Sequence, residues 1–175
     1  MTTPTWGGPA VDLRRAFRSD ASSVWAVTTA HAGLPVGFTA VSVASVSLAP
    51  PLLSFNVART SSSLHALVQS GRFAVHLLAA DQEDLARRFA ADAALRFGPG
   101  TAWRWAEDGL PHLDGVVTRV AGAVLRLVEA GDSLLVLGEV HGVDGLVDGA
   151  DRAPEPLVHH DRTYTRPAVL SGAVA

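Results

Sequence analysis

The sequence predicts a mainly β fold, a small antiparallel, Greek-key-like barrel that carries short helices. Six or seven segments have strand character, and most of them follow one another in hairpin order. Helices do not alternate with the later strands, which disfavours a doubly wound parallel sheet. The 175 residues are enough for one domain with a sizeable core, and we expect the core of that single domain (1–175) to span about residues 11–166 between flexible tails.

The first predicted strands lie in the N-terminal third of the chain. Residues 24–29 are rich in β-branched side chains, and a hairpin-type turn follows them. Residues 36–48 are either one long strand or a bent pair of strands. Pro50 and Pro51 predict the next turn, because neither proline can donate a hydrogen bond to a strand ladder. Residues 52–58 follow as an apolar strand.

Two short helices are predicted in the first half. Residues 11–18 place Leu13 and Phe17 on one apolar face. Residues 61–70 begin with hydroxyl side chains that can cap a helix, and they end at Gly71, where a glycine is expected just past the last turn.

The middle of the chain predicts a strand, a third helix and an irregular excursion. Residues 73–78 read as a strand. Residues 81–90 form a helix with Asp81 as its expected cap, and they carry acidic side chains in the first turn and arginines in the last, as the helix dipole favours. Residues 91–100 have no regular pattern.

The clearest hairpin lies near the C-terminal end. Residues 116–129 and 134–143 are two long strands joined by a tight turn. Gly122 and Gly138 inside them predict bulges or sharp coiling, as a barrel requires. Residues 157–160, with Tyr164, are expected to form a closing strand.

Composition excludes several function classes. The formal charge is −3 and lysine is absent, so a nucleic-acid partner is not expected. Cysteine is also absent, which removes disulfides, thiolate metal sites and a cysteine nucleophile. The first ten residues lack the pattern of a signal peptide, and no segment approaches the roughly 20 apolar residues of a bilayer span. We therefore expect a cytoplasmic protein with no membrane partner.

Sequence motifs for catalysis are also missing. We find no nucleophile elbow, no zinc-protease motif, no Walker loop and no dinucleotide-binding glycine motif. The seven histidines have no ligand-like spacing, so we interpret them as surface or core residues and expect no metal site. No side chain is predicted to act as a nucleophile or general base.

Residues 37–63 carry the strongest functional signal. Small and hydroxyl side chains occupy both faces of the strand at 39–47, which suits a ligand groove, although a buried strand with solvent-facing serines is the alternative. Arg59 and the hydroxyl residues 60–63 supply a charge and donors for an anion, although a plain helix cap is the alternative. A planar ring that carries a phosphate would satisfy both features, so this stretch points to a flavin.

Short segments in a fixed order give a family resemblance that runs from about Leu13 to about Tyr164. They are residues 13–17, 37–40, 45–48, 50–52, 58–59, 71–75, 81–82, 87–90, 113–115, 131–132 and 138–140. Each segment is weak alone, but the ordered set is specific. The chain resembles the short-chain flavin reductases, the reductase components of two-component flavin-dependent monooxygenases.

The resemblance implies an FMN-binding split β-barrel, usually a homodimer, that binds FMN or FAD. It implies a hydride transfer from NADH or NADPH to the flavin, after which reduced flavin diffuses to a partner monooxygenase. Such a reaction needs the two rings held in alignment but no nucleophile, because the cofactors carry the chemistry. The lack of catalytic sequence motifs agrees with this function.

The resemblance also implies which residues hold the flavin. The isoalloxazine ring and ribityl chain would lie against the strand at the start of residues 37–63, and the phosphate would lie at the end of that stretch. The ring and ribityl residues are Thr39, Ala40, Val41, Ser42, Ser45, Val46, Ser47 and Phe89, and the phosphate residues are Ala58, Arg59, Ser61, Ser62 and Ser63, with Arg96 as a further candidate.

The chain departs from the family pattern in three places. Residues 19–23 replace the usual stretch after the first helix, the glycine that usually precedes Tyr164 is missing, and one departure bears on the nicotinamide. After Gly131 and Asp132 the family typically has a histidine that positions the nicotinamide, but here the residue is Ser133. Ser133, His160 and Tyr164 are the candidates for nicotinamide contact. Two alternatives therefore stay open, a flavin-binding or carrier protein without efficient NAD(P)H turnover and an oxidase of the same fold with a permanently held FMN.

Overall fold

The computed structural model describes residues 12–145 and 154–168. The N-terminal tail expected at residues 1–9 lies outside the described residues, and so does most of the C-terminal tail expected at 167–175. Over the described part of the chain, no helix is long and apolar enough to cross a lipid bilayer.

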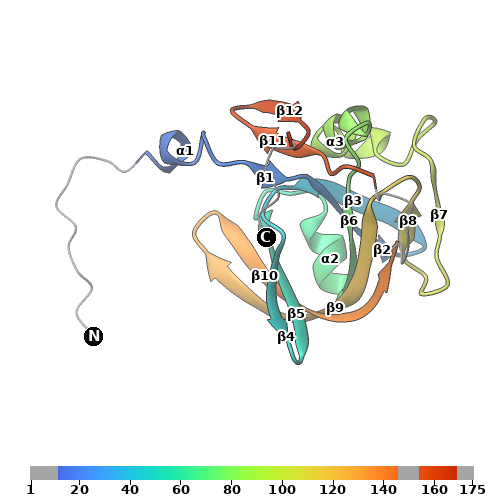
Figure 1. Ribbon diagram of the computed structural model, residues 1–175. Coiled ribbons are helices and arrows are strands. Elements are labelled where there is room, and N and C mark those ends of the chain that lie inside the picture. The colour runs from blue at the N-terminus through green and yellow to red at the C-terminus, as the bar shows by residue number, and fades with distance from the viewer. Residues whose placement is uncertain (1–11, 146–153, 169–175) are drawn as a thin grey trace, which may run out of the picture.

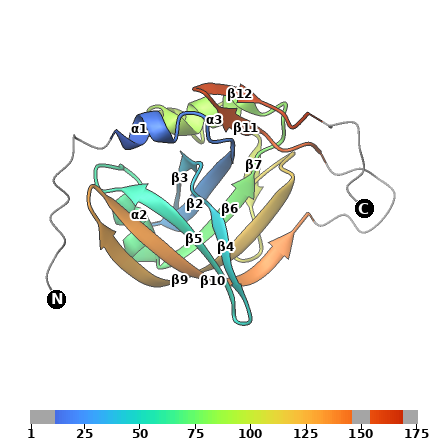
Figure 2. The same ribbon diagram turned by 60° about the vertical axis from the view of Figure 1, so that its left-hand side comes forward.

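Seven antiparallel strands form the main sheet, which curls round on itself (Figures 1 and 2). Within the described residues its two edge strands do not pair with each other, so the barrel is split, and the predicted fold class is confirmed. The strands, in sheet order, are β3 (Leu34–Ala40), β2 (Trp25–His31), β6 (Arg72–Leu77), β9 (Thr118–Ala130), β10 (Ser133–Asp144), β5 (Pro51–Ala58) and β4 (Ala44–Leu48).

Two small sheets and four short helical segments complete the described chain. The short strands are β1 (Ser22–Ser23), β11 (Val158–His160) and β12 (Thr163–Thr165) in one sheet, and β7 (Trp103–Trp105) and β8 (Pro111–Leu113) in the other. The helical segments are α1 (Leu13–Ala16), α2 (Leu64–Ser70), α3 (Glu83–Ala90) and the 3₁₀ turn η1 (Ala93–Leu95). Helix α2 packs against β2 and β6 in the hollow of the curled sheet (Figure 1).

The core is built by side chains on the inner face of the sheet. Alternate residues of β5 point inward, and Phe55 meets Phe73 of β6 edge to face with ring centroids 5.3 Å apart. A Cβ atom at Gly138 would overlap the ring of Phe73, and one at Gly122 would overlap the carbonyl oxygen of Glu139. The strand register shifts beside both glycines, which confirms the predicted bulges and explains how β9 and β10 coil over Phe73.

Other sequence predictions are confirmed or corrected at particular residues. The 36–48 segment is a bent pair, because β3 ends at Ala40 and β4 begins at Ala44. Gly71 follows α2 in the left-handed conformation (φ 63°), as predicted. The predicted cap at Asp81 is wrong, since Gln82 occupies the cap position of α3 and its side chain accepts instead from the Ala79 N–H (2.9 Å).

The predicted closing strand is also corrected. The C-terminal segment forms the hairpin β11–β12, which pairs with β1 rather than with the main sheet. Asp161 and Arg162 both have positive φ (44° and 65°), so a tight turn reverses the chain after His160. The predicted apolar face of the first helix is not buried, because Leu13 and Phe17 are mostly exposed.

Candidate functional site

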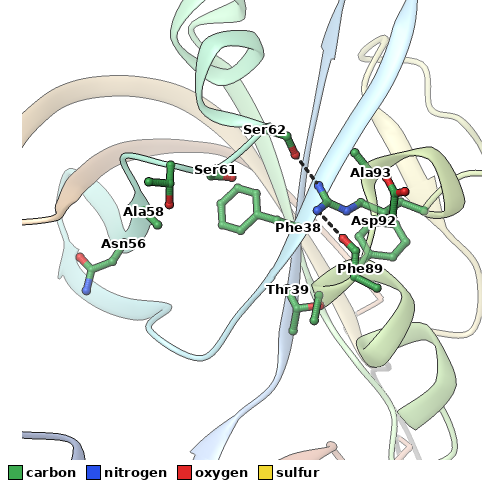
Figure 3. Close-up of a pocket in the computed structure, with 13 residues that line it drawn as sticks. Phe38, Thr39, Asn56, Ala58, Ser61, Ser62, Phe89, Asp92 and Ala93 are labelled. Carbon is green, nitrogen blue, oxygen red and sulfur yellow. Dashed lines mark hydrogen bonds between the residues drawn. The ribbon is translucent and has the colours of Figure 1, made fainter.

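An open cleft of about 570 Å³ lies between strand β3, the end of β5 and the segment that follows α3 (Figure 3). Its lining residues come from three separate stretches of the chain. They are Phe38, Thr39, Asn56, Ala58, Thr60, Ser61, Ser62, Phe89, Ala90, Ala91, Asp92, Ala93 and Arg96. Most of them are alanine, serine or threonine, so the cleft leaves room for a ligand to approach the backbone.

Close packing of β3 against α3 forms one wall of the cleft. A Cβ atom at Gly37 would lie 2.8 Å from both the Phe89 ring and the Val27 carbonyl oxygen, so only glycine allows this approach. Thr39 Oγ1 donates to the Ala86 carbonyl oxygen (2.7 Å) and ties the same two elements together. These contacts fix the aromatic ring of Phe89, which borders the cleft but is fully buried.

Arg96 is the buried cation of this cleft, with 8% of its surface exposed. Its Nη1 donates to the Gly37 carbonyl oxygen (2.6 Å) and to Ser63 Oγ (3.0 Å), with a longer contact to Ser62 Oγ (3.4 Å). Its Nη2 donates to the Ala91 carbonyl oxygen (2.7 Å). The guanidinium therefore joins β3, the start of α2 and the segment after α3.

The charge of Arg96 has no ion-pair partner among the described residues. Its Nε is buried and has no hydrogen-bond partner. Burial lowers the pKa of the Arg96 guanidinium from its ordinary value, although the nearby charge of Asp92 opposes that shift. A buried cation surrounded by neutral acceptors is suited to attract an anion.

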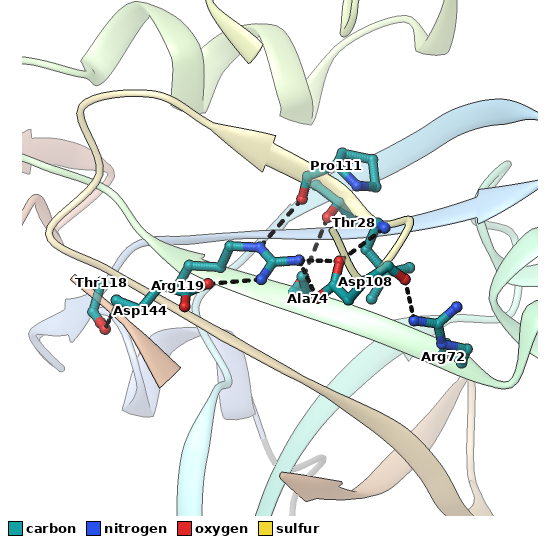
Figure 4. Close-up of polar contacts among 9 residues, drawn as sticks. Thr28, Arg72, Ala74, Asp108, Pro111, Thr118, Arg119 and Asp144 are labelled. Atoms are coloured by element: carbon teal, nitrogen blue, oxygen red, sulfur yellow. Dashed lines mark hydrogen bonds and ion pairs between the residues drawn. The ribbon is translucent and has the colours of Figure 1, made fainter. Parts of the chain in front are cut away.

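A second cleft of about 600 Å³ contains another buried arginine, Arg119 of β9. Its Nη2 donates to both carboxylate oxygens of Asp108 (2.9 and 2.7 Å), and its Nη1 donates to Asp144 (2.8 Å), as Figure 4 shows. Arg72 donates in turn to the Asp108 carbonyl oxygen. This cation is fully paired within the chain, so the arrangement braces the β7–β8 segment against β9 and β10.

Six residues predicted to bind the cofactor line the first cleft. They are Thr39, Ala58, Ser61, Ser62, Phe89 and Arg96. Ser63 lies just behind them, because it is buried and its Oγ donates to the Gly37 carbonyl oxygen (2.9 Å). The side chain of Ser63 does not cap α2.

The other predicted cofactor residues lie beside the cleft or away from it. Ala40 is buried, and the Ser42 hydroxyl accepts from the backbone N–H of Asn56 (2.9 Å). Arg59 is half-exposed, with one nitrogen 3.6 Å from Glu129 on β9. The remaining residues, Val41 and the β4 residues Ser45, Val46 and Ser47, do not line the cleft.

Of the nicotinamide candidates, Ser133 lies next to the cleft. It pairs with Ala58 across β10 and β5, and the Arg59 N–H donates to the Asp132 carbonyl oxygen (2.9 Å). The Ser133 hydroxyl donates to the Asp132 carboxylate (3.0 Å). The hairpin tip therefore adjoins the end of β5 that carries the cleft.

His160 and Tyr164 belong to the small β1–β11–β12 sheet instead. Tyr164 lines a third cleft with Asp81 and Glu83, and the Arg87 guanidinium lies 5.0 Å from the centre of its ring. Burial raises the pKa of the Tyr164 hydroxyl, although the charge of Arg87 opposes that shift. The described chain does not bring Tyr164 into the cleft that contains Arg96.

Sequence reasoning missed several cleft residues. Phe38 and Asn56 lie on strands whose pattern gave no sign of a ligand-facing side chain, and Thr60 was treated only as part of a hydroxyl cluster. Residues 90–94 form a run of small side chains interrupted by one aspartate, directly after a helix. That run is a usable signal, because a chain segment without bulky side chains can border a ligand cleft.

Among the described residues, no three His, Cys, Asp or Glu side chains come together to hold a metal.

Comparison with known proteins identifies the family. The model of the flavin reductase like domain matches residues 17–168. The NADH:FMN oxidoreductase of Rhodococcus qingshengii is 42% identical over 159 residues, which cover 91% of this chain and 82% of that protein. The reductase subunit HsaB of a flavin-dependent monooxygenase from Mycobacterium tuberculosis is 34% identical over 155 residues, covering 86% and 81% of the two chains.

Solved structures agree with this assignment. Nitrilotriacetate monooxygenase component B from Mycobacterium thermoresistibile superimposes with a TM-score of 0.84 at 33% identity, over 93% of this chain and 88% of that one. The NADH:FAD oxidoreductase SgcE6 of Streptomyces globisporus, solved with NAD and FAD fragments, gives a TM-score of 0.81 at 33% identity, over 91% and 93%. With its split barrel and its matched residues 17–168, the chain belongs to the flavin reductase like domain family.

Proposed function

We propose that this protein is an NAD(P)H:flavin oxidoreductase that reduces FMN or FAD and supplies the free reduced flavin to a partner monooxygenase. The names of its relatives support the activity and the partner class, since they include an NADH:FMN oxidoreductase and the reductase subunit of a flavin-dependent monooxygenase. The observation in this chain that carries the proposal is Arg96, a buried and unpaired cation at the wall of a cleft lined by small side chains.

The residues of the cleft fit a phosphorylated flavin. Arg96 supplies a positive charge that no described carboxylate meets at ion-pair distance, and the hydroxyls of Ser61 and Ser62 also line the cleft. Thr39 and Ala58 offer small surfaces to a ring, and the buried Phe89 ring supports that wall from behind. We assign the phosphate to the Arg96 and serine side and the ring to the Thr39 and Phe89 side.

The bound flavin would supply the two-electron chemistry by accepting hydride from the nicotinamide. Overall, NAD(P)H, a proton and oxidised flavin give NAD(P)⁺ and reduced flavin. The protein would bind the flavin and the nicotinamide and align their rings, and such alignment alone can contribute a large part of the rate enhancement. Arg96 holds its wall together through Gly37 and Ala91, while Gly37 lets Phe89 reach its position.

We also propose that the protein is a homodimer. The β4 edge exposes Val46 and Leu48 (52% and 89%), and Val41 precedes it with 46% of its surface exposed. An unpaired apolar edge strand favours association with another chain. In such a dimer, the predicted ring contacts at Ser45, Val46 and Ser47 would lie at the interface.

We further propose a cytoplasmic location, because the nicotinamide donor is a cytoplasmic metabolite.

The decisive experiment mixes the purified protein with NADH or NADPH and with FMN, FAD or riboflavin, and follows the loss of nicotinamide absorbance at 340 nm. We expect oxidation that depends on both protein and flavin. Tight flavin binding without turnover would instead indicate the carrier function, and oxidation of NADH without added flavin would indicate a permanently held cofactor.

A further inference from the structure

Asp92 is a carboxylate in a cleft that otherwise suits an anion. It is exposed, and it lines the same cleft as Arg96. Among the described residues that line the cleft, Asp92 and Arg96 are the two that carry a charge. The charge of Asp92 also acts on Arg96 electrostatically. An anion in this cleft is therefore subject to both charges.

The structural role of Asp92 does not require its charge. Its Oδ1 accepts from the Ala94 N–H (3.1 Å), and it occupies the cap position of η1. Asparagine and serine cap such turns about as well as aspartate does. Local structure therefore does not explain why this position carries a negative charge. That charge would lower the affinity of the cleft for an anionic ligand.

We propose that Asp92 sets how strongly the cleft holds a phosphorylated flavin, by repelling the phosphate while leaving the uncharged ring and ribityl chain unaffected. This inference rests on the proposed function. A reductase that supplies free flavin has to release it, and a dianionic phosphate on an unopposed buried arginine would leave slowly. Asp92 weakens that attraction without disturbing the residues that contact the ring.

The test compares FMN with riboflavin, which lacks the phosphate. For Asp92→Asn at low ionic strength, we expect the Kd for FMN to fall about three- to tenfold and the Kd for riboflavin to stay unchanged, as for removal of one screened charge near a dianion. The dissociation rate of FMN should fall in parallel, and the gain should shrink in about 0.5 M salt. Flavin fluorescence titration and stopped-flow dissociation measure these quantities without any turnover.

Glu107→Gln is the matched control. Glu107 is an exposed carboxylate that lines the second cleft, so the substitution makes the same change in net charge at a different place. An equal effect from Glu107→Gln would overturn the inference in favour of overall charge. An unchanged Kd for FMN in Asp92→Asn, or an equal change for FMN and riboflavin, would also overturn it.

The outcomes separate this inference from the proposed function. If the wild-type protein oxidises NADH with FMN but Asp92→Asn leaves FMN binding unchanged, only the role of Asp92 fails. If FMN binds more tightly to Asp92→Asn than to wild type while neither protein oxidises NADH, the reductase function fails and the role of Asp92 stands. If the wild-type protein binds neither flavin, both fail.

Discussion

Arg96 and Arg119 are both almost completely buried, with 8% and 3% of their surfaces exposed, but their charges are balanced in opposite ways. Arg119 contacts two carboxylates, Asp108 and Asp144, at hydrogen-bond distance. Arg96 contacts carbonyl oxygens and serine hydroxyls, which carry no net charge. Each arginine lines an open cleft, and the two clefts have nearly the same volume.

The difference supports the proposal that Arg96 belongs to a binding site, whereas Arg119 belongs to a structural one. Removing a guanidinium from water costs free energy, and carboxylates on the protein can offset that cost. At Arg119, Asp108 and Asp144 offset that cost, so an anionic ligand in the second cleft would add little stabilisation. At Arg96 no carboxylate lies at ion-pair distance among the described residues, so a phosphate bound there, as proposed, would complete an ion pair that the fold leaves open.

Arg119→Met is expected to have the largest effect on stability. It leaves Asp108 and Asp144 without their partner, and we expect the free energy of unfolding to fall by about 2–3 kcal/mol, below the range for fully buried pairs because both carboxylates are partly exposed. Chemical denaturation measures this. Arg104→Met is the control, because Arg104 pairs with Asp114 on the surface and should contribute little. Weakened FMN binding in folded Arg119→Met would contradict the structural role.

Arg96→Met is expected to act mainly on the ligand. Loss of a charge-assisted contact to the phosphate should raise the Kd for FMN about 30-fold, or about 2 kcal/mol, and should change the Kd for riboflavin far less. Arg96→Lys keeps the charge but not the forked geometry, so its Kd for FMN should be intermediate. A similar loss for riboflavin and FMN would mean that Arg96 supports the wall of the cleft rather than the phosphate.

His76 gives the Arg119 region a pH dependence. Residue His76 lies opposite Arg119 in the β6–β9 pairing and is fully buried, and burial lowers the pKa of its imidazole from 6.5 to about 3. The unfolded chain therefore binds a proton that the folded chain does not bind between these pH values. The free energy of unfolding should fall with decreasing pH across this window, by at most about 1.4 kcal/mol per pH unit.

His76→Asn isolates this contribution. The imidazole Nδ1 contacts the Ala26 carbonyl oxygen (3.2 Å), and an asparagine amide can donate in the same place. The variant should be less stable than wild type near pH 7 because it is smaller, but its unfolding free energy should depend less on pH between 6.5 and 3. Equal slopes for variant and wild type would show that other groups dominate acid unfolding.

The fold was predictable because its signals are local. Alternating strands and the tight turn before Ser133 depend on neighbouring residues. The glycines at 122 and 138 are visible in the sequence, although they make room for Phe73 of another strand. The failures at Asp81 and at the C-terminal hairpin depend on contacts from distant segments. Gln82 displaces Asp81 because its amide also donates to the Asp114 carbonyl oxygen (2.8 Å), and no local pattern contains that contact.

The candidate site was predictable only in part, for a related reason. The hydroxyl residues at 61 and 62 and the aromatic ring at 89 were identified from sequence and do line the cleft. The different burial of the two arginines was not predictable. Arg59 stands in the expected motif, whereas Arg96 lies in a segment without regular pattern, and its burial depends on Gly37 and Ala91 from other parts of the chain.

Arg59→Ala sharpens the contrast with Arg96 and should have the smallest effect. Arg59 is half-exposed, it does not line the cleft, and its guanidinium lies 3.6 Å from Glu129. Solvent screens an exposed cation, so we expect the Kd for FMN to rise only about two- to threefold, with no change for riboflavin. Titration of both flavins against Arg59→Ala and Arg96→Met in one buffer measures the ratio directly. An increase for Arg59→Ala as large as that for Arg96→Met would place the phosphate outside the cleft, near Arg59, and would make the unpaired charge of Arg96 a structural feature.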